Sequence, residues 1–244
     1  KVVDRTYIIN EDNHDLPVFS IVTDSSNLWD WDTGIYVLGP GASSSSPFWG
    51  ANFHKPWSKW SRIEFFDANQ LKQYDGELDL EIHGGYSRKF DQKSFRLDFK
   101  SIYTGDLDYP VISQKPNITK YNNINLRNGG NENSSNRIKD AIFSTLAQKT
   151  NIDIMGYQPC ILYLNGAYWG IYGIREKIDE HYIEANYNIT SDNLDLIGAK
   201  EKVLHGDKNS FIEAYHLLLN TDPDDIMFLT LFKDIFDINN YIDY

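Results

Sequence analysis

The stretch Glu77–Phe99 reads ELDLEIHGGYSRKFDQKSFRLDF, and its pattern decides the first elements of the fold. Charged and apolar residues alternate over Glu77–His83 and again over Lys93–Phe99, which predicts two half-buried strands. Gly84-Gly85 interrupts the alternation, so we expect a loop between the two strands.

This loop and the strand after it are rich in cations. Four Lys or Arg lie within the nine residues from Arg88 to Arg96, whereas the whole chain has 23 in 244 residues and a net charge of −12. A positive cluster in an acidic protein favours a bound anion, because the overall field repels one. Lys93 lies on the same side of its strand as Phe95 and Leu97, so its ammonium leaves an apolar face and needs an anionic partner.

The composition excludes several classes of protein. With 41% hydrophobic and 14% aromatic residues over 244 positions, the chain is globular and forms one domain or two closely packed lobes. No apolar run is long enough for a membrane span. The negative charge argues against nonspecific nucleic-acid binding. The single cysteine, Cys160, excludes an internal disulfide, and the six histidines lack paired zinc spacing, so no metal site is predicted.

The order of elements predicts an α+β fold. Further strands are expected at Leu16–Thr23, Arg62–Asp67 and Asn123–Arg127. The Asn165-Gly166 pair predicts a hairpin between Ile161–Leu164 and Ala167–Ile174. Helices are expected around Ile138–Leu146 and over Arg175–Tyr187, Asn209–Leu219 and Asp222–Phe236. The chain is thus β-rich to about residue 130 and mixed, increasingly helical, from about 131 to 244.

Two residues suit phosphoryl transfer, which needs a cation on the phosphates and a carboxylate that fixes this cation. Lys93 is the candidate cation. Glu176 is the candidate carboxylate, because it lies in register with Tyr172 and Ile174 where the second hairpin strand ends. We expect the two side chains to form an ion pair. The alternative is that each is an end-of-strand side chain in solvent.

Two polar segments are further candidates. Gly84–Arg88 could present backbone N–H groups to phosphates, although a plain hairpin turn needs the same glycines. Arg127–Asn131 could contact a nucleotide or a metal through its amides, although a self-capped turn fits equally well. Arg137 and Asp140, on the polar side of the next helix, are expected to be solvated.

Several motifs together match one known family in sequence order. They are Leu16–Asp24, Asn27–Asp30, Thr33–Val37, Glu64–Asp67, Ile82–Arg88, Gln92–Leu97, Leu126–Asn131, Tyr163–Tyr172 and Arg175–Glu180. In this order the chain resembles the CotH family, the spore coat protein H-like atypical protein kinases. The resemblance covers nearly the whole chain, and its specificity comes from the combination of motifs.

The resemblance implies a single domain over residues 1–244 with a divergent protein-kinase-like fold. It implies binding of ATP with Mg²⁺ and phosphorylation of Ser/Thr in partner proteins. Lys93 then matches the phosphate-holding lysine and Glu176 its carboxylate partner. Arg88 and Arg127 match recurrent arginines near the nucleotide. Together with the glycine loop, the candidate nucleotide-binding residues are Gly84, Gly85, Ser87, Arg88 and Arg127.

The resemblance also implies what these residues lack. In the family, a segment like Phe236–Tyr244 is followed by the catalytic Asn/Asp motif and then by the aspartate-bearing metal motif. We therefore expect the catalytic base and main Mg²⁺ ligands outside the printed sequence, and these 244 residues alone to be inactive. Family habit further implies an exported bacterial protein at the cell surface.

A second hypothesis is a non-catalytic secreted or surface module. Trp49, Trp57 and Trp60 could stack on a glycan or contact a protein partner, because aromatic faces suit both. The alternative for these three residues is that they anchor loops or belong to the core.

Overall fold

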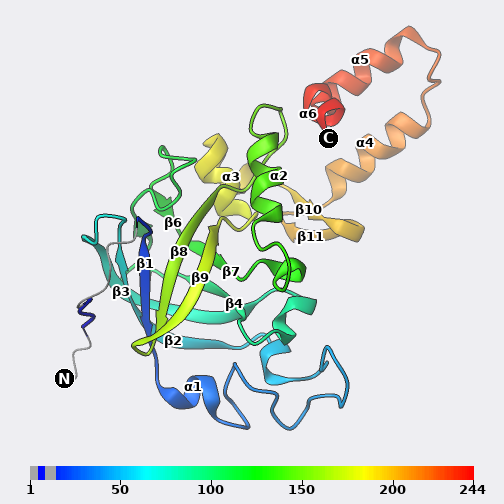
Figure 1. Ribbon diagram of the computed structural model, residues 1–244. Helices are drawn as coiled ribbons and strands as arrows, with labels where there is room; N and C mark the ends of the chain where they lie inside the picture. The colour runs from blue at the N-terminus through cyan, green and yellow to red at the C-terminus, as the bar shows by residue number, and fades with distance from the viewer. Residues whose placement is uncertain (1–4, 9–14) are drawn as a thin grey trace. The chain divides into compact units, whose positions relative to one another are not determined.

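The computed structural model describes residues 5–8 and 15–244 (Figure 1). The chain divides into two compact units, residues 1–142 with 156–177 and residues 143–155 with 178–244. The first is rich in strands and the second is mainly helical, so the predicted α+β composition is confirmed. That the chain forms one domain stays a prediction. Residues 1–4 and 9–14 of the expected β-rich part lie outside the described residues.

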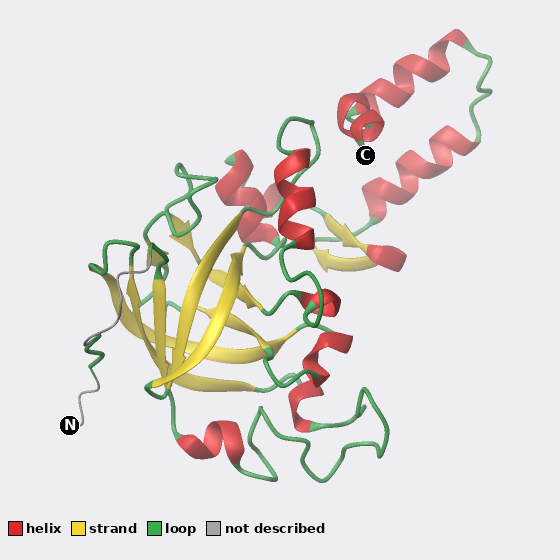
Figure 2. Cartoon of the chain, viewed as in Figure 1, coloured by secondary structure: helices red, strands yellow, loops and turns green. Residues whose placement is uncertain are grey.

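The first unit contains a closed barrel of seven strands (Figures 1 and 2). In spatial order the strands are β1 (Val18–Val22), β2 (Ser58–Phe66), β3 (Lys72–His83), β4 (Ser94–Asp98), β7 (Asn123–Arg127), β9 (Ala167–Arg175) and β8 (Tyr157–Leu164). All neighbours are antiparallel except β1 and β8, which pair in parallel with Val18 opposite Ile161. This parallel pair closes the barrel, and the sequence did not predict it.

The barrel interior is filled by the apolar half of each alternating strand. Phe95 of β4 lies opposite Leu126 of β7, which lies opposite Ile174 of β9, and all three are fully buried. Phe19 and Phe65 pack with ring centroids 4.6 Å apart. The alternation that predicted the strands therefore also places their core faces.

The expected strands and the hairpin are confirmed, with different ends for some of them. β2 starts at Ser58 and β3 at Lys72, several residues before the expected starts, because these polar residues still pair across the ladder. The turn between β8 and β9 has φ of 50° at Asn165 and 79° at Gly166. Positive φ at both central residues is what a tight two-residue hairpin turn requires.

The remaining helices and strands are short. They are α1 (Ser25–Trp29), β5 (Leu107–Asp108), β6 (Lys120–Tyr121), α2 (Lys139–Ala147), α3 (Glu180–Tyr187), β10 (Leu196–Gly198), β11 (Lys202–His205), α4 (Asn209–Leu219), α5 (Ile226–Ile235) and α6 (Ile238–Asp243). The expected bounds of α4 are confirmed. None of the described helices is long and apolar enough to cross a membrane.

Two expected helix starts are wrong, and side-chain caps explain both. Arg175 ends β9, and α3 begins only at Glu180, where the Asp179 side chain accepts a hydrogen bond from Tyr182 N at 3.2 Å. Helix α5 begins at Ile226, because the Asp225 carboxylate accepts from the backbone N–H of the second helical residue at 2.8 Å. A capped start satisfies backbone N–H groups that have no partner within the helix.

Candidate functional site

The outward face of four barrel strands carries a continuous polar row. Glu81 of β3 lies opposite Arg96 of β4, which lies opposite Asn125 of β7. Asn125 in turn lies opposite Arg175 of β9. Arg127, two residues after Asn125, shares the same face because side chains alternate along a strand. Charged and amide groups from four strands are thereby gathered on one surface.

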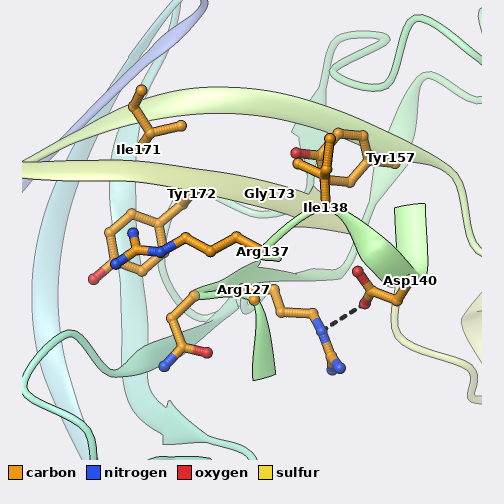
Figure 3. A pocket seen from close by; sticks show the side chains of 10 residues that line it. Arg127, Arg137, Ile138, Asp140, Tyr157, Ile171, Tyr172 and Gly173 are labelled. Atoms are coloured by element: carbon orange, nitrogen blue, oxygen red, sulfur yellow. Dashed lines mark ion pairs between the residues drawn. The ribbon is translucent and has the colours of Figure 1, made fainter. Parts of the chain in front are cut away.

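An ion pair ties the end of β7 to the start of α2 (Figure 3). The Nε atom of Arg127 lies 2.8 Å from Oδ2 of Asp140. Asp140 lies in the first turn of α2, where a carboxylate is also favoured by the helix dipole. The pair therefore holds a guanidinium at a fixed place on the polar face.

Arg137 is exposed and Asp140 partly exposed, as expected, but both also bond to neighbouring residues. Asp140 binds Arg127, as described above. Arg137 donates from Nη1 to the side-chain oxygen of Gln92 at 2.6 Å and from Nε to the carbonyl of Asn133 at 2.9 Å. The turn before α2 brings both residues back onto the strands, which helical periodicity alone does not show.

Gly130 makes room for the Arg127 guanidinium. Its φ is +64°, and a Cβ built on it would lie 2.6 Å from Nη2 of Arg127. No side chain fits there unless the guanidinium moves.

We expect Gly130→Ala to displace that guanidinium and to destabilise the fold more than Gly166→Ala. Both glycines have positive φ, so both substitutions carry the backbone strain, but a Cβ at Gly166 meets nothing within 4 Å. The added steric clash should cost on the order of 1 kcal/mol more at Gly130. Denaturant unfolding measures the difference, and equal losses for the two variants would contradict it.

His83, at the end of β3, lies among cations. Its Nδ1 lies 3.2 Å from a guanidinium nitrogen of Arg96 and accepts that hydrogen bond, so Nε2 carries the proton of the neutral ring. Burial and the charges of Arg96, Arg127, Arg88 and Lys177 lower the pKa of His83 to about 3. Burial is the largest cause of this shift, and the four cations add to it, so positive charge gathers around the ring.

A cavity of 230 Å³ opens beside the Arg127–Asp140 pair (Figure 3). Its wall is formed by Arg127, Asn128, Gly129, Arg137, Ile138, Asp140, Tyr157, Ile171, Tyr172 and Gly173. The Tyr157 ring lies against Gly173, where a Cβ would be 2.5 Å from the ring. The cavity thus combines aromatic and aliphatic surface with one guanidinium–carboxylate pair.

Asn128 links the turn after β7 to the segment before β4. Its Nδ2 donates to the carbonyl of Gln92 at 2.6 Å, and its Oδ1 accepts from the Gly130 N–H at 2.9 Å and from the Ser94 hydroxyl at 2.8 Å. Because Asn128 is buried, these bonds hold the turn rigidly. The self-capped turn that the sequence left open is therefore present, and it positions Arg127 next to it.

The expected ion pair between Lys93 and Glu176 is wrong. Both side chains point inward and are 4% exposed, as their strand register predicted. However, Lys93 Nζ donates to the carbonyls of Arg88 and Phe90, at 2.8 and 2.9 Å. Burial lowers the pKa of Lys93 to about 8.

The strand register explains why the two residues do not meet. Strands β4 and β9 run in the same direction, with Phe95 and Ile174 at the same level across β7. Lys93 lies two residues before Phe95, whereas Glu176 lies two residues after Ile174. Four residues of strand correspond to about 13 Å, so the two groups lie at different ends of the barrel.

Glu176 has local partners instead. Its Oε2 lies 2.6 Å from Nζ of Lys115 and accepts from the backbone N–H of Gly156 at 2.7 Å. A carboxylate that is buried and bonded in this way fixes the loop before β8 to the end of β9. Its place in the structure is that of a scaffold residue.

The glycine-rich segment forms a compact loop between β3 and β4. Gly84 has φ of +109°, and a Cβ on it would lie 2.7 Å from the Ser87 hydroxyl, whereas Gly85 has no atom within 4 Å of such a position. Ser87 is buried, and Arg88 donates from Nη1 to the Phe53 carbonyl at 3.0 Å. The loop is therefore more than a plain hairpin turn.

The three tryptophans of the second hypothesis do not act together. Trp57 packs against the core, and the Trp49 ring lies at a tilt beside His54 with ring centroids 4.7 Å apart. Trp60, on β2, is 46% exposed. Packing against the core, which the sequence left open, accounts for Trp57, whereas Trp49 is 57% exposed.

Sequence reasoning included Arg96 in the cation cluster, but it missed the roles of His83 and Asp140 on the polar face. Arg96 and His83 were visible as outward positions of alternating strands. The sequence order offered one signal for Asp140, because it is the acidic residue in the first turn of the helix that follows the strand of Arg127. Its pairing depends on the turn at Gly129-Gly130, whose path the sequence does not specify.

Comparison with known proteins agrees with the resemblance. The family model described as "CotH kinase protein" matches residues 80–244, which is more than half of the chain. A search of curated proteins finds no match. The matched range begins within β3 and includes the glycine loop, Arg127 and Asp140. The chain belongs to the CotH family.

Proposed function

We propose that the polar face of β3, β4, β7 and β9 binds the triphosphate of ATP, and that the protein is a kinase-like phosphotransferase for Ser/Thr hydroxyls of partner proteins. The observation that carries this proposal is the Arg127–Asp140 ion pair. It supplies the cation and the carboxylate that phosphoryl transfer requires, in place of Lys93 and Glu176.

The order of elements around this pair supports the proposal. In protein kinases a strand, a glycine-rich loop and a second strand precede a third strand, which carries a cation paired with an acid of the next helix. Here β3, the loop Gly84–Lys93, β4, β7 with Arg127, and α2 with Asp140 follow one another. The short β5–β6 pair is inserted before β7, and a 3-10 turn at Gly130–Glu132 is inserted before α2. This chain differs from protein kinases in having Arg and Asp, and not Lys and Glu, at the two paired positions.

The electrostatics of the face also fit a phosphate chain. Arg96, Arg127, Arg88 and Lys177 all act on His83, and a bound polyanion would relieve their mutual repulsion. The neutral His83 ring can donate from Nε2 to a phosphate oxygen. Arg127 is the fixed cation at the centre of this arrangement, because Asp140 holds it.

The proposal assigns no magnesium ligand among the described residues. The described residues contain no group of three or more His, Cys, Asp or Glu side chains placed to hold a metal ion. Asp140, the carboxylate on the polar face beside Arg127, is engaged by that guanidinium. The role that we propose for these residues is therefore to bind and orient the phosphates, and no catalytic step is assigned to them.

We expect the His83 imidazole to stay neutral in the free protein well below pH 6 and to gain a higher pKa when ATP binds. Its pKa of about 3 lies below the ordinary 6.5, so the folded state binds fewer protons than the unfolded state between these values. Stability from this group is present above pH 6.5 and is lost as the pH falls toward 3. Phosphate charge beside the ring reverses the effect of the cations and should raise the pKa by at least about one unit.

Imidazole ¹⁵N shifts, followed by NMR against pH with and without ATP, test this expectation. Adenosine at the same concentration is the control, because it lacks the phosphates. A His83 titration that is the same with ATP as with adenosine would contradict the proposed site. Absence of ATP binding by calorimetry at millimolar ligand would overturn the function itself.

A further inference from the structure

Two side chains of the loop Gly84–Phe90 help to hold it, those of Arg88 and Lys89. The Lys89 ammonium donates to the Tyr86 hydroxyl at 2.7 Å and to the Ser46 hydroxyl at 3.2 Å. Arg88 donates from Nε to the Gly84 carbonyl and from Nη1 to the Phe53 carbonyl. The backbone bonds within the loop are long, at 3.3 Å from Arg88 N to Gly85 O and 3.2 Å from Phe90 N to Ser87 O. A loop with such weak internal bonds needs another anchor to keep one shape.

The Lys93 ammonium supplies this anchor. Its Nζ donates to the carbonyls of Arg88 and Phe90, the last residues of the loop, at 2.8 and 2.9 Å. The ammonium lies 4.1 Å from the centre of the Phe53 ring and 5.1 Å from that of Tyr36. Carbonyl oxygens and aromatic faces together replace water around the buried cation.

The base of the same side chain is also fixed. The Lys93 N–H donates to the Tyr36 hydroxyl at 3.0 Å, and the Lys93 carbonyl accepts from the Tyr172 hydroxyl at 3.0 Å. The Tyr36 hydroxyl in turn donates to the Asp91 carbonyl at 2.7 Å. Both tyrosines belong to the core, so the ammonium projects from a rigid point.

We propose that Lys93 is a positioning residue that fixes the Gly84–Phe90 loop beside the phosphates without touching them. The inference rests on the proposed function. Two of its ammonium hydrogens are used by loop carbonyls, and the side chain is buried against Phe53 and Tyr36. Arg88, whose carbonyl Lys93 holds, is one of the cations that act on His83, so a loosened loop would alter the phosphate site.

The test compares Lys93→Met with Lys89→Met. Met keeps most of the side-chain volume but removes the donors. Lys89 lies in the same loop, and its ammonium contacts the hydroxyls of Tyr86 and Ser46. For Lys93→Met we expect hydrogen exchange of the Arg88 and Phe90 amides to rise at least about tenfold and ATP affinity to fall about tenfold, with barrel amides unchanged. For Lys89→Met we expect no change at the Arg88 and Phe90 amides, because its ammonium bonds to hydroxyls and to no loop carbonyl.

If Lys93→Met does not fold, Tyr36→Phe tests the same dependence of ATP affinity on the position of the loop. It removes the hydroxyl that joins Lys93 N to the Asp91 carbonyl and leaves the ammonium in place. We expect it to raise loop exchange and to lower ATP affinity in the same direction, because the loop position is what matters.

Three results of these experiments would contradict the proposed role of Lys93. A loss of ATP affinity in Lys93→Met without faster loop exchange would show direct phosphate contact and would overturn the inference. Unchanged affinity with a loosened loop would also overturn it while leaving the proposed function intact. Failure of the wild-type protein to bind ATP at all would overturn the proposed function, and this inference with it.

Discussion

Replacing Glu176 with alanine is expected to lower the free energy of unfolding by about 3–5 kcal/mol. Its Oε2 accepts from both the Lys115 ammonium and the Gly156 N–H, and the carboxylate is 4% exposed. Removing it takes away a buried counter-charge and a hydrogen-bond acceptor together, which costs far more than an exposed pair would. Urea unfolding of the purified protein measures the loss.

The matched control is Glu132→Ala, which removes the partner of Lys139 at the protein surface. That pair has a similar separation of 3.0 Å, but both side chains are about half exposed. We expect little measurable change there, because solvent screens the charges. Lys115→Met combined with Glu176→Leu should recover part of the loss, since neither charge is then left buried alone. Equal losses at Glu176 and Glu132 would show that burial does not set the strength of this pair.

The second large effect is expected at Arg127, where substitution by methionine should weaken ATP binding on the order of 10- to 100-fold. Charge-assisted bonds to phosphate contribute about 1.5–3 kcal/mol each, and Arg127 is the cation that Asp140 holds on the polar face. Asp140→Asn should cause a smaller loss, because the guanidinium stays charged but loses its fixed position. Isothermal titration with ATP measures both.

Lys139→Met is the control for this series. Lys139 neighbours Asp140 in sequence and carries the same charge as Arg127, but its ammonium binds Glu132 at 3.0 Å. We expect its loss to leave the ATP affinity nearly unchanged. If Lys139→Met weakens binding as much as Arg127→Met does, the effect is one of net charge and not of the polar face.

The strands and their inward faces could be predicted from the sequence, but the contacts between distant strands could not. Alternation placed Lys93 and Glu176 on the apolar faces of their strands, and both are buried. Parity along a strand shows which face a side chain occupies, but not at which end of the barrel it lies. That second fact depends on the pairings of β4, β7 and β9, which are set by the whole barrel.

The ion pair between Asp140 and Arg127 could not be predicted from the sequence for a related reason. Helical periodicity placed this carboxylate on the polar side of α2, which is correct. Whether that side faces water or another strand depends on the turn from Asn128 to Gly130, where Gly129 and Gly130 both have positive φ. A two-glycine turn allows many paths, so the local pattern could not select the one that leads back to Arg127.

The parallel β1–β8 pair has a consequence for where the domain can be cut. The family match begins at Leu80, inside β3, and excludes β1 and β2. A fragment trimmed to that match would retain β8 without β1 and the end of β3 without β2. Both strands would then be edge strands with unpaired amides and carbonyls. Exposed edge strands pair with strands of other molecules, so the trimmed fragment would tend to self-associate in solution. By pairing with β8 and β3, the strands β1 and β2 thus protect the region that matches the family from aggregation.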